Sequence, residues 1–200
     1  MINLSNKFLI YFFFLILFLP SKVHSDNFKI LAIVENRIIT SYDLFIEIKM
    51  LEKIKGSEIK KNQYNLILAQ LINDQIKSIE ISNHKLSVNL AEVDKRIDKL
   101  VPDDQFVEIR NRLKEKLLTE TKWNTLINMK YKNNLKINMN EIDILTNNKS
   151  NANKENLIKL EIQKKFNSFS ESYFNEIKKK YFIKYTKWKV YQYYLLTPIV

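Results

Sequence analysis

The sequence is poor in the residues on which turns, cross-links and many active sites depend. Its 200 residues include no cysteine, one glycine, three prolines and two histidines. Without cysteine the chain cannot build a disulfide scaffold, so its stability must come from a hydrophobic core. So few turn residues argue against a β-sandwich or barrel with many turns. The expected fold class is therefore mainly α.

Candidate catalytic groups are also scarce. His84 lies in a polar sequence that reads as a helix end, where a solvated or capping histidine is a simpler interpretation than a catalytic one. Gly56 alone cannot form a phosphate-binding loop. Pairs of acidic residues stand where helices are predicted to begin, and capping explains them. We therefore expect no catalytic residue, no metal site and no cofactor.

Residues 1–25 have the three-part pattern of a secretory signal peptide. A short segment with one lysine (1–7) precedes twelve apolar residues (8–19) and a polar exit (20–25). A membrane-spanning helix needs about 20 apolar residues, so cleavage is favoured, and retention as an anchor is the alternative. We therefore expect an exported chain whose mature form begins near Asp26.

Basic residues outnumber acidic ones, 33 against 22, and the excess lies near the C-terminal end. Residues 149–200 hold eleven basic and four acidic side chains. Such a surface can attract nucleic acid, anionic lipid or acidic protein, but export argues against nucleic acid. The alternative is a solvated lysine face on a helix. Weak contact with an anionic membrane surface therefore stays open as an interpretation.

A short β-hairpin is predicted directly after the signal peptide. Residues 29–35 read as a strand, Asn36 and Arg37 as the turn, and residues 38–40 as the return strand. A two-stranded hairpin alone is barely stable in water. It must therefore lie on a helical body or pair with another segment.

Periodic apolar residues predict several helices after the hairpin. The predicted segments are 42–55, 64–83, a short helix that ends at Val101 and Pro102, and one or two helices from Asp103 or Asp104 to about Tyr131. Thr40 or Ser41 is expected to cap the first helix, and Gly56 to end it. The segments 88–94 and 137–143 share the pattern apolar-Asn-apolar-x-Glu-apolar-Asp, which indicates a capping box at two helix starts.

A polar linker, residues 146–156, precedes a long amphipathic segment. Apolar residues recur there every three or four positions: Ile158, Ile162, Phe166, Phe169, Tyr173, Ile177 and Tyr181. This spacing predicts a C-terminal helix over residues 157–185 whose aromatic face docks on the earlier helices. The tail, residues 186–200, reads either as a strand that pairs with the hairpin or as an unordered adhesive end.

The order of these signals resembles the SurA-type periplasmic chaperones. Residues 33–44 are similar to the hairpin and capped first helix of that family, and residues 68–94 to its long second helix and next cap. Residues 105–110 and 137–143 continue in the same order. The resemblance implies a helical SurA-like N-terminal domain with a short β-hairpin over residues 26–145. The long C-terminal helix, 157–185, would complete its core.

The resemblance also bears on activity. In that family, one or two parvulin-type prolyl isomerase domains stand between the N-terminal domain and the closing helix. Here the eleven residues 146–156 take their place, and eleven residues are too few for such a domain. The resemblance therefore implies the chaperone core alone. Isomerase activity carried over with the family name is one alternative, and an exported helical subunit of a membrane-associated complex is another.

The implied function is a periplasmic holdase for unfolded outer-membrane β-barrel proteins, which assists their folding and assembly. Such clients expose alternating apolar side chains and unpaired strand edges, so their binder needs an adaptable apolar surface and no nucleotide or metal. The candidate client-binding residues are aromatic: Phe169, Tyr173, Phe174, Tyr181 and Phe182. Core packing is the alternative for those on the inward stripe of the helix, whereas Phe174 and Phe182 fall beside it.

Overall fold

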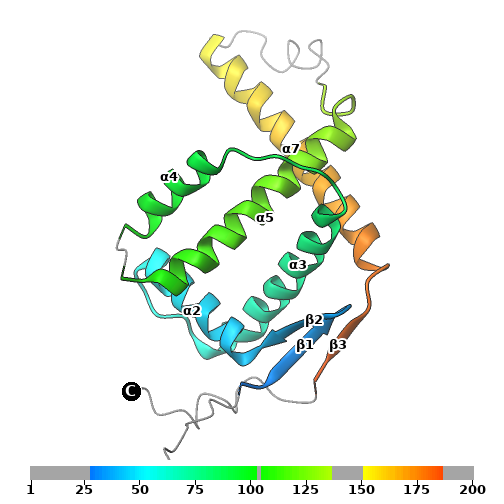
Figure 1. Ribbon diagram of the computed structural model, residues 1–200. Coiled ribbons are helices and arrows are strands. Elements are labelled where there is room, and N and C mark those ends of the chain that lie inside the picture. The colour runs from blue at the N-terminus through cyan, green and yellow to red at the C-terminus, as the bar shows by residue number, and fades with distance from the viewer. Residues whose placement is uncertain (1–27, 103–104, 137–150, 187–200) are drawn as a thin grey trace, which may run out of the picture.

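The computed structural model describes residues 28–102, 105–136 and 151–186 of the chain (Figure 1). The elements of these residues are β1 (Ile30–Val34), β2 (Arg37–Thr40), α2 (Ser41–Lys55), the short 3-10 helix η1 (Lys61–Gln63), α3 (Tyr64–Ser82), α4 (Leu90–Leu100), α5 (Val107–Tyr131), α7 (Asn151–Lys178) and β3 (Ile183–Tyr185). The predicted fold class is confirmed, since helices dominate, the hairpin is present and a long helix lies near the C-terminus. None of the described helices is both long and apolar enough to cross a membrane.

The three strands form one antiparallel sheet in the order β2-β1-β3. Val34 of β1 pairs with Arg37 on one side and with Ile183 on the other. The sheet therefore joins the start of the described chain to its end. The hairpin gains the third strand that its marginal stability requires.

The predicted hairpin turn is wrong by one residue. Glu35 and Asn36 form it, and Arg37 belongs to β2, where its guanidinium donates to Ser78 Oγ of α3 at 3.0 Å. Glu35 has a φ of +54°, an uncommon conformation for a residue with a long side chain. Two hydrogen bonds to Phe182 hold it there, because the Glu35 amide donates to the Phe182 carbonyl at 2.9 Å and Glu35 Oε1 accepts from the Phe182 amide at 2.6 Å.

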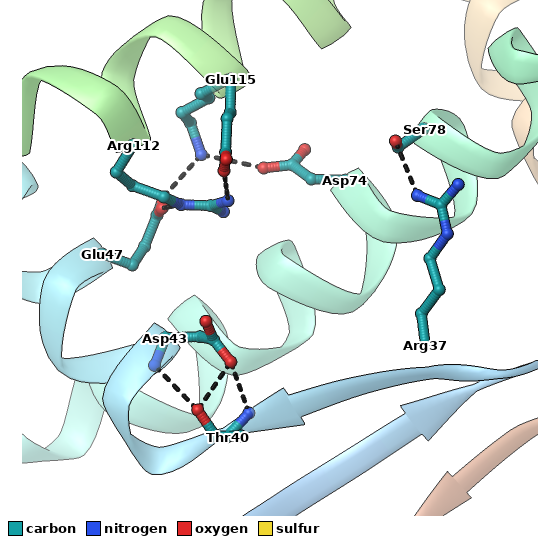
Figure 2. A network of polar contacts seen from close by, with 9 residues as sticks. Arg37, Thr40, Asp43, Glu47, Asp74, Ser78, Arg112 and Glu115 are labelled. Carbon is teal, nitrogen blue, oxygen red and sulfur yellow. Dashed lines mark hydrogen bonds and ion pairs between the residues drawn. The ribbon is translucent and has the colours of Figure 1, made fainter. Parts of the chain in front are cut away.

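Both predicted ends of the first helix, α2, are confirmed. Thr40 Oγ1 accepts from the Asp43 amide at 3.2 Å, and Asp43 Oδ2 accepts from the Thr40 amide at 2.7 Å, which is a complete capping box (Figure 2). At the other end Gly56 adopts the left-handed conformation with a φ of +66° and donates its amide to the Glu52 carbonyl. Glycine, which has no Cβ, adopts this conformation without steric cost, so Gly56 ends the helix.

The first copy of the repeated pattern is confirmed as a helix start with an asparagine N-cap, but within the described residues the Glu92 side chain does not form the return hydrogen bond of a full capping box. Asn89 precedes α4, and its side-chain oxygen accepts from the Glu92 amide at 3.4 Å. The second copy, in residues 137–143, lies outside the described residues.

The predicted helices before Tyr131 form a single helix, α5. Phe106 occupies its N-cap position and makes no side-chain capping hydrogen bond. Asp103 and Asp104, the predicted caps, lie outside the described residues.

The C-terminal helix differs from its prediction at both ends. α7 begins at Asn151, so the last six residues of the predicted polar linker are helical, and it ends at Lys178 instead of residue 185. Ala152, Lys154 and Glu155 are acceptable helix formers, which explains why polarity alone did not make this segment a linker. Beyond Lys178 the open edge of β1 offers backbone hydrogen bonds, and residues 183–185 take them as a strand.

The main core lies where α3, α5 and α7 meet the sheet, and Figure 1 shows α7 crossing α5 on its way to β3. Its fully buried side chains include Val34, Leu44, Ile72, Ile76, Ile127 and Ile177. A smaller cluster joins α4 to α2 and α5 through Met50, Val93, Ile97, Val101, Leu113 and Leu117. The predicted docking of the C-terminal helix on the earlier helices is thus confirmed.

A buried carboxylate links the three central helices. Glu47 of α2 is 0% exposed, and its two oxygens accept hydrogen bonds from Arg112 Nε and Lys116 Nζ of α5, both at 2.7 Å (Figure 2). Lys116 Nζ also lies 3.0 Å from Asp74 Oδ2 of α3. Burial alone would lower the pKa of Lys116, but Asp74 and Glu47 outweigh it and the pKa is raised. Glu47 therefore holds two cations in place between the helices.

Replacement of Glu47 by alanine is expected to lower the free energy of unfolding by about 3–5 kcal/mol, because Arg112 and Lys116 then lose their shared buried counter-ion. Urea unfolding followed by circular dichroism measures this loss. Lys164→Ala serves as the control, because Lys164 pairs with Glu161 on the exposed surface of α7 and such pairs contribute little. A loss in Glu47→Ala no larger than that of the control would show that the network does not hold the helices together.

Candidate binding surface

The aromatic residues of α7 pack mainly against α5. Tyr173 is only 5% exposed and stacks on Trp123, with 5.6 Å between ring centroids. Phe169 stacks on Tyr131 at 4.7 Å. Pairs of this geometry stabilise a contact beyond the burial of their area. Tyr173, proposed from the sequence as a client contact, is therefore a core residue that a client cannot reach.

Phe174 is also engaged within the chain. It is half-buried and meets Trp123 edge-on at 6.2 Å. The ammonium groups of Lys77 and Lys178 lie 5.4 and 5.7 Å from its ring centroid, within the range of cation–π attraction. Little of this ring is left for a client, although it lies beside the inward stripe of α7.

One carboxylate of α3 fixes two tyrosines of the C-terminal segment. Glu80 Oε1 accepts from the Tyr173 hydroxyl at 2.5 Å, and Glu80 Oε2 accepts from the Tyr181 hydroxyl at 2.7 Å. Burial raises the pKa of Glu80, but the two hydroxyls outweigh this and hold the pKa below its ordinary value. Burial and the same hydrogen bond raise the pKa of Tyr181 to about 12. Both hydroxyls therefore stay protonated as donors.

His84 lies beside this group, at the end of α3. Its Nε2 is 3.7 Å from Glu80 Oε1, and its backbone amide donates to the Ile81 carbonyl at 3.1 Å. This is the helix-end position that the sequence indicated. No three side chains that could together hold a metal ion come together in the part of the chain that the structure describes.

Phe182 differs from the other four candidate residues because it is 63% exposed. The Glu35 amide donates to its carbonyl, which extends the pairing of β1 and β3 by one residue. Side chains alternate along a strand, so Phe182 shares a face of the sheet with Lys184. Ile33 pairs with Lys184 on one side and with Ile38 on the other, so these residues share that face too.

This face is the outer face of the sheet. It is defined by Ile33, Ile38, Phe182 and Lys184, of which Ile38 is 55% exposed and Ile33 is half-buried. The opposite face packs on the helical core through Ala32, Val34 and Ile39. The outer face thus combines an aromatic ring, two aliphatic side chains and one cation.

The outer edge of β3 borders this face. Within the described residues, no strand pairs with β3 on the side away from β1. The Phe182 carbonyl accepts from the amide of Glu35, the residue after β1, and the Thr186 amide donates to Leu31 of β1. Backbone groups alternate in direction along an antiparallel strand. The amides and carbonyls of Ile183 and Tyr185 therefore point away from β1, and the Tyr185 side chain is 60% exposed.

A hollow lies between the end of α2 and the start of α5. It has a volume of about 450 Å³ and is lined by Lys49, Glu52, Lys53, Gly56, Phe106 and Ile109. The Lys53 ammonium lies over the Phe106 ring, 3.9 Å from its centroid. The hollow is wide open, and its one aromatic ring is already covered by this cation, so it is a weaker candidate than the sheet.

Comparison of the chain with models of known protein families and with characterised proteins finds no match. The arrangement of residues therefore carries the functional argument.

The sequence indicates Phe182 as a candidate binding residue, but it does not indicate Ile33, Ile38, Lys184 or Tyr185. Ile33 and Ile38 belong to the predicted hairpin, but a hairpin sequence does not tell which of its two faces is left uncovered. Lys184 and Tyr185 fall at the end of the predicted C-terminal helix. The alternation of apolar and polar residues over Ile183, Lys184, Tyr185 and Thr186 is the available signal for a strand.

Replacement of Glu80 by glutamine is expected to lower the free energy of unfolding by about 1–3 kcal/mol at neutral pH, because two hydroxyls lose a charged acceptor. The pKa of Glu80 is lowered in the folded state, so its contribution is present above the ordinary value of 4.5 and is lost as the pH falls through the folded pKa. The difference between the wild type and Glu80→Gln should therefore shrink between pH 6 and pH 3. Urea unfolding over this range measures it.

Glu171→Gln is the matched control, since Glu171 is exposed on α7. Its unfolding midpoint should stay close to that of the wild type at pH 6. A Glu80→Gln variant that behaves in the same way would mean that the two tyrosines do not depend on this carboxylate.

Proposed function

We propose that this protein is a periplasmic chaperone that holds unfolded outer-membrane β-barrel precursors and assists their assembly. The observation that carries the proposal is the outer face of the sheet, where Phe182 and Ile38 are exposed beside an edge of β3 with which no other described strand pairs. The resemblance to the SurA-type chaperones and the predicted signal peptide support the same function and the periplasmic location.

The chemistry of this surface suits such clients. Unfolded barrel strands alternate apolar and polar side chains, and they expose unpaired backbone groups. Full burial of a side chain such as Phe182 or Ile38 stabilises a complex by about 1.5–3 kcal/mol, before the costs of association are subtracted. Two or three such contacts give weak binding with little sequence preference. Weak binding suits a holdase, which must release its client for assembly.

The helical body supports this surface as a rigid platform. α7 is fixed to α5 by aromatic stacking and to α3 through Glu80, and β3 follows within five residues of the end of α7. Lysines of the closing segment, among them Lys179 and Lys184, add positive charge at this end. This charge supports a weak secondary attraction to an anionic membrane surface, where the clients are assembled.

We expect a chain that starts at Asp26, which keeps every described residue, to suppress the light scattering of a urea-unfolded barrel protein diluted into buffer. Suppression should occur near equimolar ratio and should persist at high salt, because apolar contact carries it. The double variant Ile38→Ser and Phe182→Ser should need about tenfold more protein for the same effect. Met129→Ser is the matched control, because Met129 is equally exposed but lies in the last turn of α5.

No suppression by the wild type at large excess would contradict the proposal. Co-purification of one partner at fixed stoichiometry would then favour an exported subunit of a membrane-associated complex. Equal suppression by the double variant and the wild type would mean that clients bind to a surface other than the sheet.

A further inference from the structure

We propose that the sheet binds its partner by strand addition: an extended segment of a non-native chain pairs with the outer edge of β3 as a fourth strand. The identity of this partner rests on the proposed chaperone function. The mode of binding rests on the geometry of β3 alone.

The first argument is the set of backbone groups at this edge. The amides and carbonyls of Ile183 and Tyr185 point away from β1, as the hydrogen bonds of Phe182 to Glu35 and of Thr186 to Leu31 require. An extended chain laid along this edge in antiparallel orientation would exchange hydrogen bonds with both residues. Main-chain hydrogen bonds of this kind give affinity that does not depend on the sequence of the added strand.

The second argument is that β3 is already held in the extended conformation. At one end Glu35 Oε1 accepts from the Phe182 amide at 2.6 Å. At the other end the Thr186 hydroxyl donates to the Ile30 carbonyl at 2.6 Å, and its amide donates to the Leu31 carbonyl at 3.1 Å. A strand fixed at both ends does not have to be ordered when a partner binds, which removes one of the costs of association.

The third argument is charge. Lys184 is the middle residue of β3, and its side chain is exposed on the outer face and forms no ion pair with an acidic side chain among the described residues. Relative to an added antiparallel strand, Lys184 occupies a non-hydrogen-bonded position, where facing side chains come closest. An aspartate or glutamate facing it complements its charge. The residue two positions away on the added strand then meets Phe182 and is best apolar.

The same charge argues against a second copy of this chain as the partner. Two β3 strands that pair about their centres would place Lys184 against Lys184, and facing like charges destabilise a strand pair. Lysine at a sheet edge is a common protection against self-association. The recognised segment is therefore a foreign strand with an acidic residue at its centre and an apolar residue two positions away.

The test uses two variants that differ in one backbone donor. Tyr185→Pro removes the outward amide that an added strand would need, whereas Tyr185→Val loses the same ring and keeps the amide. Proline is tolerated on an edge strand when its missing N–H does not face a neighbour. Equal circular dichroism and urea midpoints establish that both variants fold. Fluorescence anisotropy with a nine-residue peptide of threonine and phenylalanine around a central glutamate measures binding.

We expect Tyr185→Pro to bind this peptide about tenfold more weakly than Tyr185→Val. N-methylation of the peptide distinguishes its two sets of amides. The glutamate amide points away from β3, so a methyl group there should be tolerated, while methyl groups on the two neighbouring amides should abolish binding. Lys184→Glu should favour a peptide with a central lysine over the original peptide by about two- to fivefold.

Equal affinities of the two Tyr185 variants, or equal effects of the two methylation patterns, would overturn strand addition. A concentration-dependent dimer that competes with the peptide would overturn it as well, in favour of pairing between copies. Suppression of aggregation by Tyr185→Pro as good as by Tyr185→Val would leave the chaperone proposal standing without this mode. Peptide binding that follows the expected pattern, with no suppression by the wild type, would leave strand addition standing and reject the chaperone.

Discussion

The docking of α7 on α5 and α3 is the contact on which the binding surface depends. Glu80 accepts two tyrosine hydroxyls from the C-terminal segment, and Trp123 stacks on one of the same rings. This anchoring brings Phe182 to Glu35, across 147 residues of sequence. Without it β1 would keep an open edge, and the hairpin would have no third strand. The outer face of the sheet therefore depends on the docking of α7, which places β3 beside β1.

Two buried or half-buried carboxylates thus organise a mainly apolar core. Glu47 holds the cations of α5 against α2, and Glu80 holds the tyrosines of the C-terminal segment against α3. Apolar packing alone allows a helix to slide or rotate against its neighbours. A buried charge costs free energy unless its charged and hydrogen-bonding partners lie beside it. The two carboxylates therefore select one placement of the helices.

The aromatic residues of the C-terminal segment have two roles, core packing and surface exposure. Most of those on α7 stabilise the helical body, and Phe182 is left exposed directly before β3. The body is therefore rigid, while the surface proposed for binding is small, apolar and open. A binder of non-native chains benefits from this division, because a rigid edge can accept many sequences through backbone contacts and a few tolerant side-chain contacts.

The sequence by itself determined what depends on neighbours a few residues apart. The cap at Thr40, the stop at Gly56, the cap at Asn89 and the helical class follow from such local patterns. The strand β3 and the roles of Glu47 and Glu80 depend on partners far along the chain. Tyr181 continues the helical spacing of α7, so periodicity could not reveal where the helix ends. Only the tertiary structure decided where α7 ends, because residues 183–185 pair with the edge of β1 that the hairpin leaves unpaired, and this edge is distant in sequence.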